Sequence, residues 1–311
     1  MSAWSNLMQR LRAVGRSMLR SEGHPEALSR SEGHLERLAA VMDRTERHLG
    51  FIAATMARRE MLQMIADPRF DDPRRLERSG YRVHSQYDED GIIAEIFRRI
   101  GTTNRTCVEF GAGNGSENCT GFLVMQGWRT LWIDGSDSFL FFMNASWAPQ
   151  MASKQLVAIH AFITVDTIDD LIRGAGFSGE IDFLTVDLDG NDYHILEKIS
   201  AVSPRVICAE YNGNIPPDVD WKMPYKADYV WDTLDDRTGV SLKALETLLA
   251  GRGYALVGCS LAGVNAFFVR RDLAEGKFAE PFTAENHYNS WRFFYERPAS
   301  TTNWRDWQSR R

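Results

Sequence analysis

The sequence has few cysteines, no excess of basic residues and no long apolar run, and each of these shortages excludes a class of protein. Its four cysteines form no C-x-x-C pair, so buried free thiols are expected instead of a disulfide framework or a zinc ribbon. Lys and Arg number 36 against 42 Asp and Glu, which argues against a nucleic-acid partner. No apolar run approaches the roughly 18 residues of a membrane-spanning helix, and the N-terminus lacks a signal-peptide core. These shortages predict a soluble, cytoplasmic protein.

The residues that are present fit a globular protein with an appendage. The hydrophobic fraction is 44% and the aromatic fraction is 11%, as in ordinary folded domains. With 311 residues, the chain can form one domain of about 200 residues and a smaller segment.

Residues 1–65 are predicted to be helical. Over residues 4–18 apolar side chains recur at helical spacing among arginines, which predicts a basic helix that either packs on its own protein or contacts an anionic membrane surface. The Ser-Glu-Gly-His sequences at 21–24 and 31–34 are expected as solvated turns. Farther on, apolar residues are spaced alternately by three and four, with one polar interruption. The members of this heptad pattern are Leu35, Leu38, Met42, Thr45, Leu49, Ile52 and Met56.

The heptad pattern predicts a coiled coil and therefore a homo-oligomer. The alternative is an intramolecular hairpin with residues 2–20. After this segment, Pro68 and Asp71-Asp72-Pro73 indicate a linker over residues 66–80. Strand and helix signals then alternate between residues 105 and 212, which predicts βαβ units and a parallel sheet, and an antiparallel hairpin follows over residues 254–270. Residues 81–272 form the predicted domain, and residues 273–311 an extension that packs near its site.

The central motif is Cys-Val-Glu-Phe-Gly-Ala-Gly-Asn-Gly at residues 107–115. It reads as a short buried strand that runs into a glycine-rich turn, the kind of turn that lets a backbone approach a ligand closely. Ser116 stands where the dinucleotide fingerprint G-x-G-x-x-G needs its last glycine. The next strand, 128–133, ends at Asp134, and a carboxylate in this place can accept the hydroxyls of a ribose.

The E-x-G-x-G-x-G arrangement resembles motif I of class I S-adenosylmethionine-dependent methyltransferases. Together with the segments 85–91, 181–193, 204–212 and 263–269, it resembles the FkbM-like branch, over roughly residues 80–272. The resemblance implies an α/β fold with a Rossmann-like, seven-stranded sheet that is mostly parallel and ends in an antiparallel hairpin. It also implies S-adenosylmethionine as the cofactor, held by Gln86, Glu109, Gly111, Gly113, Gly115, Asn118, Asp134, Gly135, Phe162 and Asp187.

For two of these residues, Phe162 and Gln86, the sequence itself also bears on the assignment. Phe162 lies near the end of the predicted strand 155–163, where it or Ile163 would form an apolar wall beside the adenine. Ser85 and Asp88 have the form of a helix capping box, S-x-x-D, and a cofactor contact by Gln86 comes second to that cap. His160, inside the same predicted strand as Phe162, is expected to be a core histidine.

Acidic residues at two strand ends predict the chemistry. Asp187 and Asp189 follow the fourth strand, and Glu210 and Asn212 follow the fifth, so their oxygens should converge beside the cofactor. They would either hold Mg²⁺ or leave Asp187 to act directly as a base. His287 is a second candidate base.

The insertion 215–231 carries Trp221, Tyr225, Tyr229 and Trp231. These rings would either stack on an acceptor or cover the sheet.

The resulting prediction is an O-methyltransferase that acts on a hydroxyl of a sugar, a glycan or a related small metabolite. Two alternatives stay open. One is a nicotinamide-dependent sugar oxidoreductase, which the broken glycine fingerprint disfavours. The other is a catalytically silent oligomeric scaffold.

Overall fold

The computed structural model describes residues 25–231 and 238–292. The chain forms two compact units, Met1–Arg59 and Glu60–Arg311, and each is described by itself. The basic helix predicted over residues 4–18 lies outside the described residues, as does the end of the C-terminal extension after residue 292.

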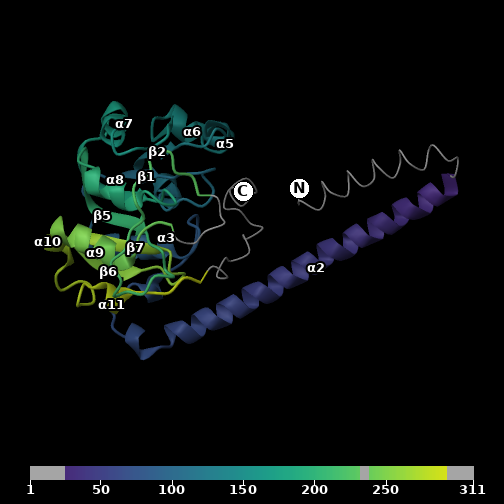
Figure 1. Ribbon diagram of the computed structural model, residues 1–311, viewed down its shortest axis with the longest axis horizontal. Coiled ribbons are helices and arrows are strands. Elements are labelled where there is room, and N and C mark those ends of the chain that lie inside the picture. The colour runs from purple at the N-terminus through teal and green to yellow at the C-terminus, as the bar shows by residue number, and fades with distance from the viewer. Residues whose placement is uncertain (1–24, 232–237, 293–311) are drawn as a thin grey trace. The chain divides into compact units, whose positions relative to one another are not determined.

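The first unit contains most of helix α2 (Pro25–Ile65), a single helix of 41 residues (Figure 1). At about 1.5 Å per residue it is about 60 Å long. The second Ser-Glu-Gly-His sequence, residues 31–34, lies inside this helix and not in a turn, because one glycine costs only about 1 kcal/mol among strong helix formers. Within the described part of the chain, no helix combines the length and apolarity needed to cross a bilayer.

The second unit is built on a seven-stranded sheet with the strand order β3-β2-β1-β4-β5-β7-β6. All neighbouring strands are parallel except β7, which is antiparallel to both β5 and β6. This is the methyltransferase-type sheet predicted from the sequence, and the prediction of fold class is confirmed. The strands are β1 (Thr106–Phe110), β2 (Arg129–Asp134), β3 (Leu156–His160), β4 (Gly179–Val186), β5 (Val202–Glu210), β6 (Tyr254–Cys259) and β7 (Asn265–Arg270).

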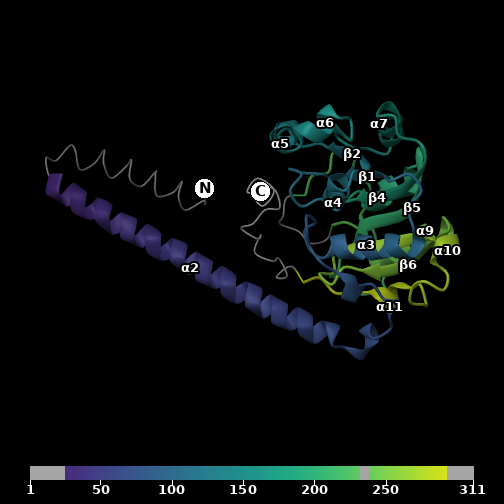
Figure 2. The ribbon, with the colours of Figure 1, turned by 180° about the vertical axis from the view of Figure 1, so that it is seen from behind.

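Helices cover both faces of the sheet (Figures 1 and 2). One apolar core lies under α7 (Ile168–Gly174), α8 (Asp192–Lys198) and α9 (Leu242–Gly251). A second core, on the other face, includes side chains of α3 (Glu89–Ile100) and α4 (Gly121–Met125). All four cysteines are buried and free, as predicted.

Residues 66–80 are not a free linker but pack into the second unit. They form two short 3-10 helices, η1 (Pro68–Phe70) and η2 (Glu77–Ser79), and bury Phe70 and Leu76. The Arg99 guanidinium of α3 donates to the carbonyls of residues 73, 74 and 75. The prolines and aspartates that suggested a linker therefore belong to a segment that packs against the second unit.

The C-terminal extension folds back on the end of β5. After α10 (Arg271–Ala274) and α11 (Ala284–His287), the carbonyl of Asn289 accepts a hydrogen bond of 2.5 Å from the Tyr211 hydroxyl. The Tyr288 hydroxyl donates to the carbonyl of Gly213 over 2.6 Å. These two bonds bring the extension to the strand end where the site lies.

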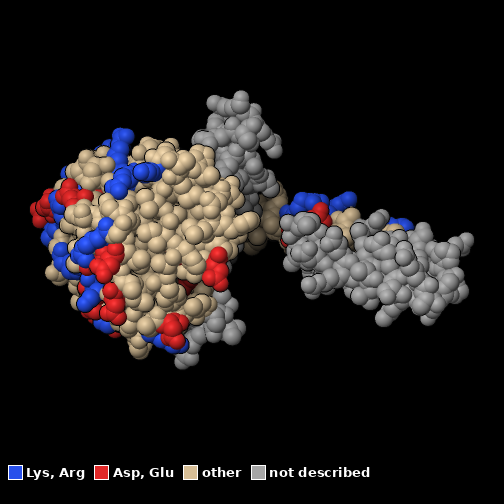
Figure 3. Space-filling view, turned by 90° about the horizontal axis from the view of Figure 1, so that it is seen from above, with Lys and Arg blue, Asp and Glu red and all other residues tan. Residues whose placement is uncertain are grey.

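One end of the domain has an uncharged surface. Figure 3 shows few charged residues where α5 (Phe139–Ser146) and α6 (Ala148–Ala152) lie. Residues 138–153 include no charged residue, and Phe141 is 71% exposed. The charged side chains of the domain therefore lie on surfaces other than that of residues 138–153.

A buried ion pair ties the amino-terminal ends of three strands together. The Asp182 carboxylate of β4 accepts from Arg205 of β5 over 2.7 Å and from the backbone N–H groups of residues 103–105, just before β1. Burial alone would raise the pKa of Asp182, but these hydrogen bonds outweigh it and lower the pKa below its ordinary value. Asp182 therefore stays charged and fixes the spacing of the strands.

Replacing Asp182 by alanine should lower the free energy of unfolding by about 3 to 5 kcal/mol, because Arg205 would stay buried without its carboxylate. Chemical denaturation at pH 7 measures this loss. Since the pKa is lowered in the folded state, the stabilisation is present above the unfolded pKa of about 3.9 and disappears as the pH falls through the folded pKa.

Glu180→Ala is the matched control, because Glu180 lies on the same strand and pairs with Arg270 at the surface. Its loss should cost less than about 1 kcal/mol. Equal losses for the two variants would contradict the role given to Asp182.

Candidate functional site

A pocket of about 730 Å³ opens at the carboxyl ends of the parallel strands. In open α/β sheets, ligands bind at this edge. The structure brings ten of the predicted site residues to its lining: Gln86, Gly111, Gly113, Asp134, Gly135, Phe162, Asp187, Asp189, Glu210 and Asn212.

The pocket depends on a close approach of two backbones at its floor. Gly111 follows β1 with a φ of +73°, and a Cβ at this position would lie 1.6 Å from the carbonyl oxygen of Asp187. Any other residue would force the ends of β1 and β4 apart. The glycine is therefore needed for the contact between the loop after β1 and the acidic turn after β4.

Asp134 holds the glycine loop from the end of β2. Its Oδ2 accepts a hydrogen bond of 2.7 Å from the backbone N–H of Gly113, and its Oδ1 accepts one of 2.7 Å from that of Ser136. A carboxylate offers about four acceptor sites, so Asp134 can still accept hydroxyl groups of a ligand. Its place at the tip of β2 agrees with the predicted ribose-binding position.

Phe162 forms an apolar wall beside this half of the pocket, as its position after β3 suggested. Its ring is 46% exposed and lies against Gly135, where an added Cβ would come within 3.1 Å of it. His160, by contrast, is exposed and near the Gly135 carbonyl, not in the core. It lies at the end of an edge strand, where nothing in the described part of the chain buries it.

Three predicted cofactor residues do not line the pocket and support the loop from behind. The buried Glu109 carboxylate accepts from the backbone N–H groups of Cys119 and Thr120, and burial raises its pKa to about 7 against the effect of these bonds. The Asn118 amide donates to the Ala112 carbonyl over 3.0 Å, and the Gly115 carbonyl accepts from a tryptophan indole. The motif therefore identified residues that shape the glycine loop, but these three side chains and backbones do not line the pocket.

Gln86 reaches the pocket, but the neighbouring cap differs from the predicted one. Asp90, not Asp88, pairs reciprocally with Ser85, because its Oδ2 accepts from the Ser85 N–H while the Ser85 hydroxyl accepts from the Asp90 N–H. Asp90 also takes the N–H groups of residues 83 and 84. Asp88 instead accepts from the backbone N–H of Leu261 over 3.3 Å.

Three carboxylates gather on the other side of the pocket. Asp187, Asp189 and Glu210 each offer an oxygen within 4.8 Å of the others. Asp187 and Glu210 lie close enough for each carboxylate to shift the pKa of the other. Burial, and then repulsion from the neighbouring acids, raises the pKa of both well above their ordinary values. This side of the pocket is therefore suited to bind a proton or a cation.

A buried fourth acid shapes the turn that carries Asp189. The Asp192 carboxylate accepts from the backbone N–H groups of Leu188 and Gly190, over 2.8 and 3.0 Å, and burial raises its pKa to about 6. Asp189, between them, has a φ of +57°. Strained backbone of this kind is typical of binding sites.

Tyr229 of the insertion and Thr238 contact the same turn from outside. Thr238, which the sequence analysis did not single out, donates through its hydroxyl to the Asp189 carbonyl over 2.6 Å. Gly190 faces Tyr229, whose ring carbons would lie 2.5 Å from an added Cβ. Thr238 has no recognisable motif, so only the folded chain reveals its role.

Asn212 lies in the lining, yet its amide already holds the local loop. Its Oδ1 accepts from the backbone N–H of Asn214, and its Nδ2 donates to the Thr238 carbonyl. Asn212 therefore orders the loop after β5 beside the carboxylates.

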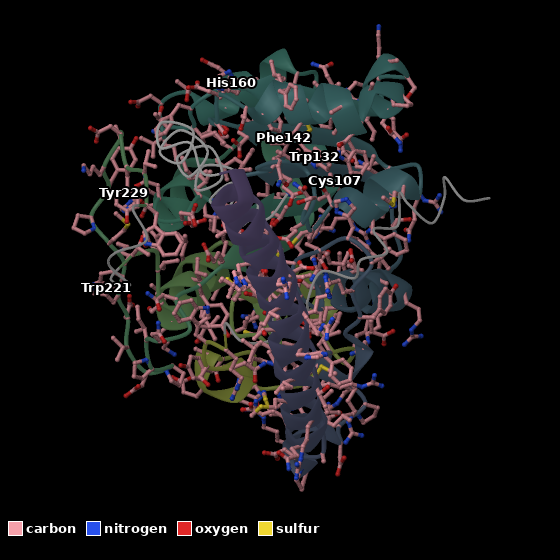
Figure 4. The ribbon with its side chains drawn as sticks, turned by 90° about the vertical axis from the view of Figure 1, so that its right-hand side faces the viewer. Cys107, Trp132, Phe142, His160, Trp221 and Tyr229 are labelled. Carbon is pink, nitrogen blue, oxygen red and sulfur yellow. The ribbon has the colours of Figure 1, made fainter. Side chains whose placement is uncertain are left out.

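The four aromatic residues of the insertion divide between the two predicted roles. Tyr229 and Trp231 line the pocket, whereas Trp221 and Tyr225 do not. The Tyr225 hydroxyl accepts from the backbone N–H of Val165, and Figure 4 shows Trp221 and Tyr229 at separate places along the loop. Two of the four rings therefore line the pocket and two lie outside the lining.

His287 is not placed to act as a base. Its side chain is buried in α11, its Nε2 lies 3.0 Å from the Ala279 carbonyl, and it does not line the pocket. Burial, followed by repulsion from Arg75, lowers its pKa to about 4. From this segment it is Trp291 that reaches the pocket.

The charge of the lining has one sign. Among the described residues of the pocket there are four carboxylates and no lysine, arginine or histidine. An anionic ligand would meet no counter-charge on the described walls.

Comparisons with known proteins give the following findings. The sequence matches no family model and no curated protein. An O-methyltransferase from Bacillus cereus, solved in complex with SAH, is 15% identical over 68% of this chain and 89% of its own, with a TM-score of 0.41. An S-adenosylmethionine-dependent methyltransferase from Clostridium acetobutylicum is 14% identical over 59% and 91%, with a TM-score of 0.37. Since such likenesses are weak, we base the function on the strand order and the pocket.

Proposed function

We propose that this chain is an S-adenosylmethionine-dependent O-methyltransferase that acts on a hydroxyl of a sugar, a glycan or a related small metabolite. The motif order over residues 80–272 supports an FkbM-like branch of these enzymes. The observation that carries the proposal is that one pocket joins a nucleoside-type half, with Gly113, Asp134 and Phe162, to a carboxylate half, with Asp187 and Glu210.

The topology favours this cofactor over a nicotinamide dinucleotide. Dinucleotide-binding sheets have the order 3-2-1-4-5-6 with parallel strands, whereas here the antiparallel β7 is inserted between β5 and β6. The third glycine of the dinucleotide fingerprint is also replaced by Ser116. Both features count against the oxidoreductase alternative.

The lining supports an acceptor without negative charge. Tyr229 and Trp231 offer ring faces on which a sugar can stack, and the carboxylates can accept its hydroxyls. No cation on the described walls would balance a phosphate or a carboxylate. A neutral or amino-substituted polyol therefore fits the pocket better than an acidic one.

The bound cofactor would supply an electrophilic methyl group on its sulfonium. The chain has to hold the acceptor hydroxyl in line with that methyl and remove its proton. Asp187 lies at the floor beside Gly111, so its carboxylate is the candidate for taking the proton. Its raised pKa makes it a better proton acceptor than an ordinary aspartate.

The same carboxylates also fit a divalent cation. Asp187, Asp189 and Glu210 provide hard oxygen ligands within 4.8 Å of one another, which is the donor type that Mg²⁺ prefers. A cation held there would favour the alkoxide-like form of the hydroxyl. The proposal includes both possibilities, with Asp187 central to each.

The first prediction concerns the cofactor half. Replacing Asp134 by alanine should weaken S-adenosylmethionine binding by about 10- to 100-fold, because hydrogen bonds to a charged group contribute about 1.5 to 3 kcal/mol. Calorimetric titration of wild type and variant measures the change. Asp137→Ala is the control, since its exposed side chain lies in the same loop but outside the lining; a similar loss there would contradict the assignment.

The second prediction concerns turnover. Asp187→Asn keeps the shape of the side chain and should lower the rate of methyl transfer by about 100- to 10,000-fold, as for the loss of a general base, while cofactor affinity changes little. Release of S-adenosylhomocysteine is measured with neutral sugars and with their carboxylated counterparts. Turnover by the variant at the wild-type rate, or a preference for the acidic sugars, would contradict the proposal.

Two additions to this assay separate the alternatives for Asp187. Loss of activity in EDTA that Mg²⁺ restores would assign the carboxylates to a cation. Unchanged activity in EDTA would assign Asp187 as the direct base.

A further inference from the structure

We propose that α2 is a self-association element through which a second copy of this chain packs along one stripe of the helix. The stripe, called the seam below, consists of Leu35, Leu38, Met42, Thr45, Leu49, Ile52 and Met56. The proposal is independent of the methyl-transfer function.

The spacing of the seam is that of a helix packed on another helix. Its members follow one another at alternating intervals of three and four residues inside one uninterrupted helix. A repeat of about 3.5 residues drifts slowly around a helix of 3.6 residues per turn, and two such helices keep their seams in contact by a left-handed supercoil. A helix that packs on a flat protein surface would not require this spacing.

The seam is exposed where it is most apolar. Leu38, Leu49, Ile52 and Met56 are 53%, 62%, 51% and 66% exposed. Alanines at positions 39 and 53 lie beside the seam, so a second backbone can come close. Burying these side chains against a partner would remove a large apolar area from water.

The one polar member does not prevent burial. The Thr45 hydroxyl donates to the Val41 carbonyl one turn earlier, over 2.9 Å. Its donor is thus satisfied within its own helix, and its methyl group can face a partner. A buried hydroxyl without a partner would otherwise oppose pairing.

A second copy fits the seam better than any other segment of this chain. The seam spans 22 residues, from 35 to 56, whereas the longest other described helix, α3, has 12. A second α2 has a seam of the same length and would cover all 22 residues, including Leu49, Ile52 and Met56.

The test compares full-length chains by sedimentation over a range of protein concentrations. Wild type should sediment as a dimer or a larger oligomer. The double variant Leu49→Glu, Ile52→Glu places charge in the exposed apolar part of the seam, and it should self-associate at least 10-fold more weakly.

Phe51→Glu is the matched control. Phe51 lies between the two substituted positions, is 73% exposed, and falls on the opposite face of the helix at 100° per residue. It should leave self-association unchanged. Circular dichroism confirms that α2 stays helical in each variant, so that lost association is not lost helix.

Every other outcome overturns the proposal. A wild-type chain that is monomeric at all concentrations would show that the seam is covered within one chain. An oligomer that survives the double variant, or one that Phe51→Glu weakens equally, would place the interface elsewhere.

Discussion

The backbone contact between Gly111 and the carbonyl of Asp187 is the constraint on which the candidate site depends. It brings the loop after β1 against the turn after β4, with no room for a side chain between them. The Asp134 carboxylate accepts a hydrogen bond from the loop after β1, and the Asp192 carboxylate accepts two from the turn after β4. These bonds hold both walls of the pocket in place. A nucleoside-binding half and an acidic half thus share one floor, which is what an in-line group transfer requires.

The acidic residues of this domain fall into two groups, according to the partners of their carboxylates. Asp90, Glu109, Asp182 and Asp192 are buried and accept backbone N–H groups, so they shape loops and strand ends. Asp187, Asp189 and Glu210 instead lie together on one side of the pocket, within 4.8 Å of one another. Their mutual repulsion has no cationic side chain among the described lining residues to relieve it. This imbalance is the physical reason to expect a proton, a cation or a positively charged cofactor between them.

The sequence predicted most of the architecture but only part of the site. Strands such as 107–110 and the tip residue Asp134 could be predicted, because apolar runs and their acidic ends follow the sheet periodicity. The direction of a side chain could not: Glu109 turns inward to cap the segment before α4, and His287 is enclosed by its own segment. The packing of residues 66–80 and the clamp by Thr238 depend on contacts between distant parts of the chain. Local pattern contains no signal for such contacts.

Calorimetric titration decides whether the pocket binds S-adenosylmethionine, on which the proposed function depends. The purified full-length chain is titrated with S-adenosylmethionine and, separately, with NADH, each in the presence of Mg²⁺ and of EDTA. We expect saturable binding of S-adenosylmethionine and none of NADH. Binding of NADH alone would contradict the proposed function in favour of an oxidoreductase, and binding of neither would favour a scaffold without catalysis.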